Sequence, residues 1–79
     1  MNNEIFNKVK SVLYNALNVS EAEITPEAEL VNDLGVNSLE LADLILSCEE
    51  EFNIQVPDEA AGKFATVKDV VDFIDRAIK

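Results

Sequence analysis

Several residue types are absent or scarce in this 79-residue chain, and each shortage excludes a class of function. There is no histidine, so the chain lacks an imidazole to serve as a general base or as a metal ligand near neutral pH. A single cysteine, Cys48, excludes an intramolecular disulfide and a cysteine-based zinc site. The chain has no apolar run of the roughly 20 residues that span a bilayer, and its start is not the basic and then apolar segment of a signal peptide. We therefore expect a cytoplasmic protein that is not an enzyme and holds no metal.

Basic residues are scarce too, and they lie only near the two ends of the chain. Six Lys and Arg stand against sixteen Asp and Glu, which gives a formal net charge of −10. Residues 11–62 contain no base but hold twelve acids, namely Glu21, Glu23, Glu27, Glu29, Asp33, Glu40, Asp43, Glu49, Glu50, Glu51, Asp58 and Glu59. Such a charge disfavours nucleic acid and membrane partners and attracts basic protein surfaces. Acidity that served solubility alone would give no reason to keep the bases at the ends.

Apolar spacing and capping residues predict helices along most of the chain. In residues 4–17 the apolar side chains recur on one helical face: Ile5, Val9, Val12, Leu13 and Ala16. A second helix is predicted over 38–52, and a short helical turn from Pro57 to near Gly62. The last helix follows Thr66 as its N-cap and carries further residues at core spacing: Val67, Val70, Val71, Ile74 and Ile78.

Residues 18–37 are predicted to form a long loop, because they lack a helical period and contain a Thr25-Pro26 step and the flexible Gly35. We expect apolar side chains to pin this loop to the core: Val19, Ile24, Leu30, Val31 and Leu34. A loop of this length in a small domain is more often functional than idle. Since no β-like alternation is sustained, the sequence predicts one all-α domain over residues 1–79, a small four-helix bundle of three main helices and one short helix.

The predicted helix over 38–52 carries apolar side chains on two opposite faces. One stripe suits a core, and it consists of Leu41, Leu44, Ile45, Cys48 and Phe52. The other stripe consists of Leu39, Ala42 and Leu46, with Asp43 and Glu50 beside it and Glu40 and Glu49 further round. Because burying so many unpaired carboxylates is costly, we interpret the second stripe as a partly exposed docking strip for a partner. The alternative is that helix packing is broad and that Leu46 belongs to the core.

A serine stands where the loop meets this helix. Asn37 is a good N-cap and Glu40 is placed as its capping-box partner, so the helix is predicted to begin at Ser38. The N-terminal end of a helix favours an anion attached to such a hydroxyl. Without a histidine to activate it, Ser38 is better interpreted as a handle that another enzyme modifies than as a nucleophile of its own.

The segment around this serine resembles the phosphopantetheine attachment motif of acyl carrier proteins, usually written with Asp-Ser-Leu: Leu34-Gly35-Val36-Asn37-Ser38-Leu39. Three further stretches fall at the spacing of the bacterial type II fatty-acid carriers, and they are Glu49-Glu50-Glu51-Phe52, Val56-Pro57-Asp58-Glu59 and residues 66–74. The chain is therefore similar to these carriers over nearly its whole length, without a gap.

The resemblance implies a carrier of fatty-acid or related synthesis. In that family a holo-synthase, which is a phosphopantetheinyl transferase, moves 4′-phosphopantetheine from coenzyme A to the serine, here Ser38, and the thiol of the arm carries acyl groups as thioesters. Partner enzymes with basic docking patches would recognise Asn37, Leu39, Glu40, Ala42, Asp43, Leu46, Glu49 and Glu50. The acyl chain would slip between helices lined by Leu44, Leu46, Val31, Phe64 and Ala61. We expect the carrier to be a monomer.

Two alternatives stay open on the sequence alone. A dedicated carrier for a polyketide, aminoacyl or other specialised pathway would keep the arm and change the cargo. An acidic helical adaptor without a prosthetic group would use Ser38 only at the helix start. Asn37 is a departure from the family pattern, because aspartate usually stands there. The exchange keeps a good N-cap but removes a negative charge beside Ser38, which bears on recognition by a general holo-synthase and points to a dedicated pathway.

Overall fold

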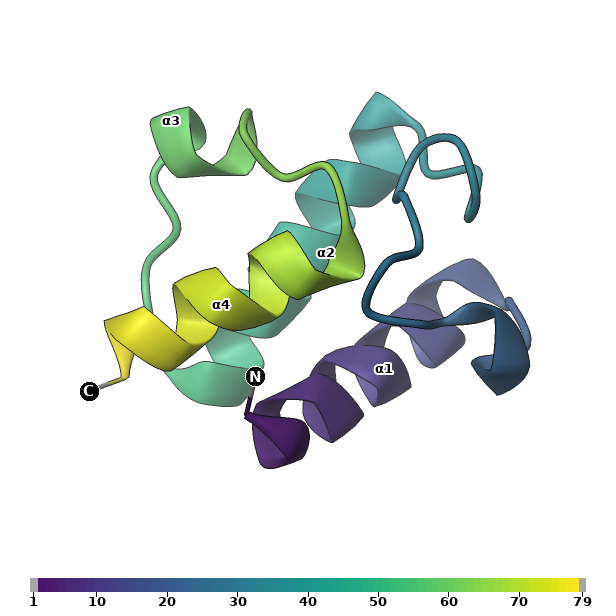
Figure 1. Cartoon of the computed structure of the whole chain (residues 1–79). Helices are drawn as coiled ribbons and strands as arrows, with labels where there is room; N and C mark the ends of the chain where they lie inside the picture. Colours follow the sequence, from purple (N-terminus) through teal and green to yellow (C-terminus); the bar gives the residue numbers. More distant parts are fainter. Residues whose placement is uncertain (1, 79) are drawn as a thin grey trace.

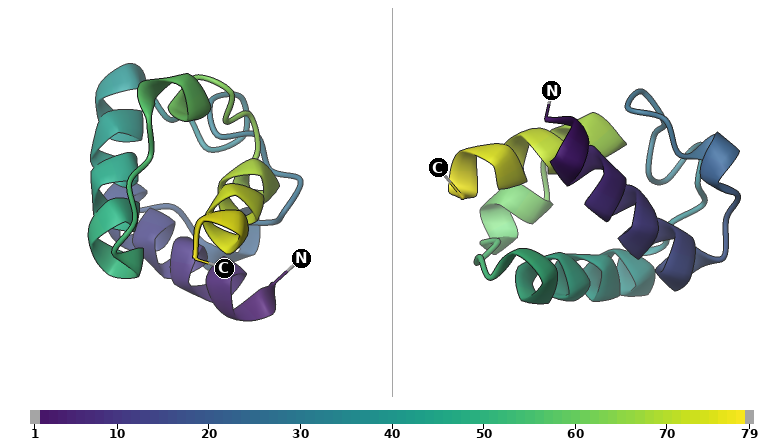
Figure 2. Two further views of the ribbon diagram at one scale, coloured as in Figure 1. Left: turned by 90° about the vertical axis from the view of Figure 1, so that its left-hand side faces the viewer. Right: turned by 90° about the horizontal axis from the view of Figure 1, so that it is seen from below.

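Four α-helices and one 3₁₀ turn make up the structure, a computed structural model that describes residues 2–78. In chain order they are α1 (Asn3–Leu17), the 3₁₀ turn η1 (Glu21–Glu23), α2 (Ser38–Phe52), α3 (Asp58–Ala61) and α4 (Val67–Ala77). The three long helices surround the core, and α3 lies across the space between α2 and α4 (Figures 1 and 2). Within residues 2–78, strand-like pairing is confined to one isolated bridge between Glu29 and Thr66. The predicted all-α bundle is confirmed.

The core forms where α1 packs against both α2 and α4. Its buried apolar side chains come from α1 (Ile5, Val9, Leu13), α2 (Leu44, Cys48), α4 (Val67, Val70, Val71, Ile74) and the long loop (Ile24, Ala28, Leu30, Leu34, Val36). Full burial of one such leucine or isoleucine contributes roughly 1.5–3 kcal/mol. The predicted core spacing of α1 and α4 is thereby confirmed at its central positions.

Local capping sets the ends of the helices. The Asn2 side chain accepts hydrogen bonds from the backbone N–H groups of Glu4 and Ile5, so α1 begins one residue earlier than predicted. Asn18 and Asn53 adopt the left-handed conformation that ends α1 and α2, which asparagine tolerates better than most residues. Ser20 caps η1, and its side chain accepts a hydrogen bond from the N–H of Ala22.

The long loop is fastened to the start of α4. The N–H of Leu30 donates to the carbonyl of Ala65 (2.9 Å), and the N–H groups of Val67 and Lys68 donate to the carbonyls of Ala28 (3.0 Å) and Pro26 (2.9 Å). The loop therefore supplies acceptors for N–H groups that a helix start leaves without partners. This explains how a 20-residue-long connection stays ordered.

Three predicted core contacts are wrong. Val31 was expected to pin the loop, but its side chain is 63% exposed. It lies in a helical turn in which Leu30 and Leu34 share the inner face, so Val31 points outward. Ile78 was expected in the core, but it follows the last residue of α4 and is 47% exposed. Ala16 lies at the edge of the α1 stripe and is exposed.

Asp69 provides a prediction about stability. Its carboxylate accepts hydrogen bonds from the N–H groups of Ala65 and Thr66, both at 3.0 Å, and Thr66 Oγ1 accepts from the N–H of Asp69. We expect Asp69→Asn to lower the free energy of unfolding by about 1 kcal/mol at neutral pH, as for other lost helix caps. Denaturant unfolding of both proteins measures this difference.

The same contribution should depend on pH. The backbone hydrogen bonds from Thr66 and Ala65 hold the pKa of Asp69 below its ordinary value of 3.8. Its stabilisation is therefore complete above the pKa of the unfolded chain and is lost as the pH falls through the lower folded pKa. The two proteins should differ at pH 7 and converge well below pH ~4. Asp72→Asn, on the same helix but outside the capping box, is the control; an equal loss in both variants would contradict the assignment.

Candidate functional site

Ser38 is the first residue of α2, and its side chain is exposed. Asn37 Oδ1 accepts a hydrogen bond from the N–H of Glu40 (2.8 Å), and Glu40 Oε1 accepts one from the N–H of Asn37 (3.1 Å). The predicted capping box and helix start are thus confirmed. By helix geometry the N–H groups of Ser38 and Leu39 have no carbonyl acceptor within α2, so they favour negative charge at this end.

The chain before Ser38 is held firmly. Leu34 and Val36 are both buried, and the N–H of Val36 donates to the carbonyl of Leu30 (2.9 Å). Gly35 between them has φ +69°, while a Cβ placed there would meet no described atom within 4 Å. Glycine is needed here for its backbone conformation and not for space. The exposed serine is therefore displayed on an ordered support.

The two faces of α2 differ as the sequence predicted. Leu44 and Cys48 are buried, and Leu41, Ile45 and Phe52 are half-buried. On the other side Leu39 is 78% exposed, Leu46 is 56% exposed and Ala42 is exposed as well. The alternative that Leu46 belongs to the core is wrong. The small bundle covers only one side of this helix, and the apolar strip that follows Ser38 faces outward.

The acids of α2 fall into two groups. Asp43 and Glu50 are exposed. Glu40 and Glu49 are half-buried, and each carboxylate is bound to backbone: Glu40 completes the capping box, and Glu49 Oε2 accepts a hydrogen bond from the N–H of Val56 at 2.8 Å. Sequence spacing predicted the bond of Glu40 but not that of Glu49, because Val56 lies beyond the end of the helix.

A groove of about 380 Å³ runs from Ser38 between α2 and α3. It is lined by Ser38, Leu41, Ala42, Ile45, Leu46, Glu49, Val56, Asp58 and Ala61. Of the residues predicted to line an acyl site, Leu46 and Ala61 line this groove. Leu44 and Val31 do not line it, because Leu44 is buried in the core and Val31 points outward from the loop.

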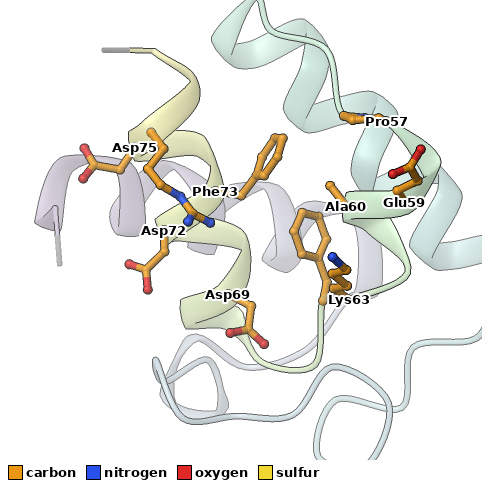
Figure 3. Close-up of a pocket in the computed structure, with 10 residues that line it drawn as sticks. Pro57, Glu59, Ala60, Lys63, Asp69, Asp72, Phe73 and Asp75 are labelled. Atoms are coloured by element: carbon orange, nitrogen blue, oxygen red, sulfur yellow. The ribbon is translucent and has the colours of Figure 1, made fainter.

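A second hollow, of about 650 Å³, lies on the other side of α3, against α4. Phe64 lines this hollow, and not the groove beside Ser38 where it was expected. Its ring packs edge-to-face on that of Phe73, with the centroids 5.7 Å apart. Figure 3 shows Phe73 directed from α4 toward Ala60, while Asp69, Asp72 and Asp75 follow α4. Ser38 does not belong to this hollow, so the larger cavity is not the one at the helix start.

Other chemistry-bearing groups give no second site. Cys48 is buried, and burial, together with the nearby Glu51 and Glu49 carboxylates, raises the pKa of its thiol to about 12. A thiol with such a pKa is unreactive near neutral pH. Among residues 2–78 no cluster of Cys, Asp and Glu is arranged to hold a metal ion. In the same range, no helix combines the length and the hydrophobicity that crossing a bilayer requires.

Comparison with known proteins bears directly on the segment that contains Ser38. Residues 7–74 match the family described as "Phosphopantetheine attachment site". The chain is also 48% identical, over 71 residues, to the acyl carrier protein of Helicobacter pylori strain J99. That alignment covers 90% of this chain and 91% of the relative. The similarity therefore extends over the whole bundle and not over one motif alone.

Proposed function

The chain belongs to the acyl carrier proteins, and from this membership we propose that Ser38 is the residue to which 4′-phosphopantetheine is attached. As a member of this family it is a carrier and not an enzyme, and it interacts with a phosphopantetheinyl transferase and with acyl-processing enzymes. The arm supplies a terminal thiol on which acyl groups are held as thioesters. An acidic adaptor without a prosthetic group is thereby set aside.

The surroundings of Ser38 fit a phosphodiester. The hydroxyl is exposed at the start of α2, where helix N–H groups and the macrodipole favour an attached anion. Asn37 carries no charge, and the Glu40 carboxylate is bound to the N–H of Asn37. No activating base is needed in this chain, because the transferase brings the catalytic groups. These observations support Ser38 as the attachment residue. Its position in the motif Leu-Gly-Val-Asn-Ser-Leu is that of the attachment serine.

The exposed face of α2 supports a docking role. We propose that Leu39, Ala42 and Leu46 contact partner enzymes and that the exposed acids beside them, Asp43 and Glu50, attract basic patches. The uncharged Asn37 and the half-buried Glu40 and Glu49 complete the predicted surface. Exposed charge pairs raise the rate of encounter and the specificity more than the affinity, which suits a carrier that must exchange partners. The net charge of −10 makes copies of the chain repel one another, which supports a monomer. We further propose that the chain acts as a single domain in the cytoplasm.

The groove beside Ser38 supports a fatty-acyl cargo. Most of its lining is aliphatic, as in Leu41, Ile45, Leu46 and Val56. An alkyl chain placed there would leave water at a gain of about 0.8 kcal/mol per buried methylene. A polar aminoacyl group would lose hydration against this mainly aliphatic lining. We therefore favour acyl intermediates of fatty-acid synthesis over the specialised cargoes.

The attachment site can be tested by intact mass. Incubation with coenzyme A and a promiscuous holo-synthase should add one phosphopantetheine to the protein. Ser38→Ala should abolish the gain, whereas Ser11→Ala, which changes an exposed serine of α1, should keep it. No gain with several synthases, or a gain that persists in Ser38→Ala, would contradict the assignment.

The docking face can be tested by comparing two exposed apolar residues. Leu39→Ala should lower kcat/KM of a phosphopantetheinyl transferase about tenfold, the usual size for a contact residue at the centre of an interface. Tyr14→Ala removes a side chain that is 49% exposed on α1 and should change kcat/KM little. Thermal unfolding checks that both variants fold. Equal effects of the two substitutions would refute a docking face on α2.

Asn37 can be tested by restoring the usual aspartate. Asn37→Asp should speed phosphopantetheinylation by a fatty-acid-type synthase roughly two- to fivefold, because it adds attraction beside Ser38 and caps α2 equally well. The gain should shrink with added salt. Asn15→Asp, which adds the same charge to an exposed position of α1, is the matched control. Equal or slower rates for Asn37→Asp would show that this charge does not govern recognition.

A further inference from the structure

Helix α3 is weakly anchored along its length. It has four residues, none of them buried, and its N-cap Pro57 makes no side-chain cap. Its backbone hydrogen bonds are local, from the N–H groups of Ala60 and Ala61 to the carbonyl of Pro57 and from that of Gly62 to Asp58. Hollows flank it on both sides: the groove lies against α2, and the larger hollow, shown in Figure 3, lies against α4. The position of α3 therefore depends on how the chain enters and leaves it.

The exit of α3 is held by aromatic packing. Phe64 follows the helix and packs edge-to-face on Phe73 of α4. This contact fixes one end of the segment to α4 and leaves the other end, on the α2 side, to be fixed separately.

The entrance of α3 is held by Glu49. Its backbone carbonyl accepts hydrogen bonds from the N–H groups of Asn53 and Ile54, the latter at 3.1 Å. Its carboxylate reaches further and accepts one from the N–H of Val56 at 2.8 Å. Hydrogen bonds to an ionised acceptor are roughly twice as strong as neutral ones. Val56 directly precedes Pro57, so this bond fixes the point at which α3 begins.

We propose that Glu49 is a positioning residue, whose carboxylate holds α3 against α2 by binding the Val56 N–H and so keeps the groove beside Ser38 narrow. The proposal rests on the proposed function in one respect only, namely that the groove holds an acyl chain. Glu49 and Val56 both line the groove, and Asp58 and Ala61 of α3 belong to its lining too. Without the bond, α3 is free to swing toward the hollow on its α4 side, and the groove widens.

Glu50 provides the contrast within the same helix. It is exposed and lines a different hollow, with Val12, Asn15 and Ala16 of α1. Both residues carry the same charge, but only Glu49 binds the α2–α3 connection in the described structure. A role in docking alone would make the two acids similar in effect, whereas a positioning role makes Glu49 distinct.

Two substitutions separate charge from hydrogen bonding at residue 49. Glu49→Gln removes the charge but keeps an oxygen acceptor for the Val56 N–H. Glu49→Ala removes both, and Glu49→Leu does the same while keeping the side-chain volume. A purely electrostatic role predicts that Gln behaves like Ala and Leu. A positioning role predicts that the Gln variant, which keeps a weaker hydrogen bond, lies closer to the parent protein than the Ala and Leu variants do.

The direct readout is amide hydrogen exchange of Val56, measured by NMR on the protein without its prosthetic arm. Exchange should rise about tenfold or more in Glu49→Ala and Glu49→Leu, as expected for the loss of a hydrogen bond to a charged group. It should rise less in Glu49→Gln, which keeps a neutral hydrogen bond, and it should change less than about threefold in Glu50→Ala. The Ile54 N–H, bound to a backbone carbonyl, is the internal reference for folding. An unchanged Val56 exchange in both Ala and Leu variants, or equal exchange in Gln and Ala, would overturn the proposal.

The second readout concerns the cargo. On protein loaded with an octanoyl thioester, cleavage by hydroxylamine should be several-fold faster for Glu49→Ala than for the parent, Glu49→Gln or Glu50→Ala. If Glu49→Ala speeds the amide exchange of Val56 but not the cleavage of the thioester, the part of the proposal that concerns the groove is overturned. Failure of the parent protein to accept the arm would refute Ser38 as the attachment site, while the exchange experiment would still decide whether Glu49 positions α3.

Discussion

The contact of α1 with both α2 and α4 is the interaction on which the rest of the structure depends. It buries Leu13, Leu44 and Ile74 in one core, and residues 2–78 hold no further long helix to cover the far side of α2. That helix is therefore packed on one side and open on the other. Leu39 and Leu46 are exposed for this reason, so the same helix supplies core residues and the proposed surface for partners.

The proposed attachment site is tied to this core through the long loop. Leu34 and Val36 are buried on either side of Gly35, and the carbonyls of Pro26 and Ala28 accept hydrogen bonds from the start of α4. Loops generally move more than the elements they connect, but this one is held at several points before it reaches Asn37. Ser38 thus combines an exposed hydroxyl with a fixed position, which a visiting enzyme requires.

The sequence predicted the features that depend on a few neighbouring residues. The start of α2 followed from Asn37 and Glu40, and the start of α4 from Thr66, because a cap acts within one helical turn. Predictions failed where the outcome depends on distant packing. Val31 and Leu30 are equally apolar, and only the direction of the turn shows which one points inward. Glu49 and Glu50 are adjacent and identical, and only the path of the chain after α2 shows that one of them meets Val56.

This difference between adjacent acids clarifies how the charge of α2 is used. An exposed carboxylate such as that of Glu50 acts at a distance, over roughly the 8–10 Å that salt permits at physiological ionic strength. A carboxylate bound to backbone, as in Glu40 and Glu49, acts through contact and is screened much less. A partner that brings a basic side chain to α2 is attracted by the first group, but it competes for the oxygens of the second. In the proposed arrangement, encounter with a partner depends on exposed carboxylates such as that of Glu50, whereas the position of α3 beside the groove depends on that of Glu49. The two residues are neighbours in one acidic run of the sequence.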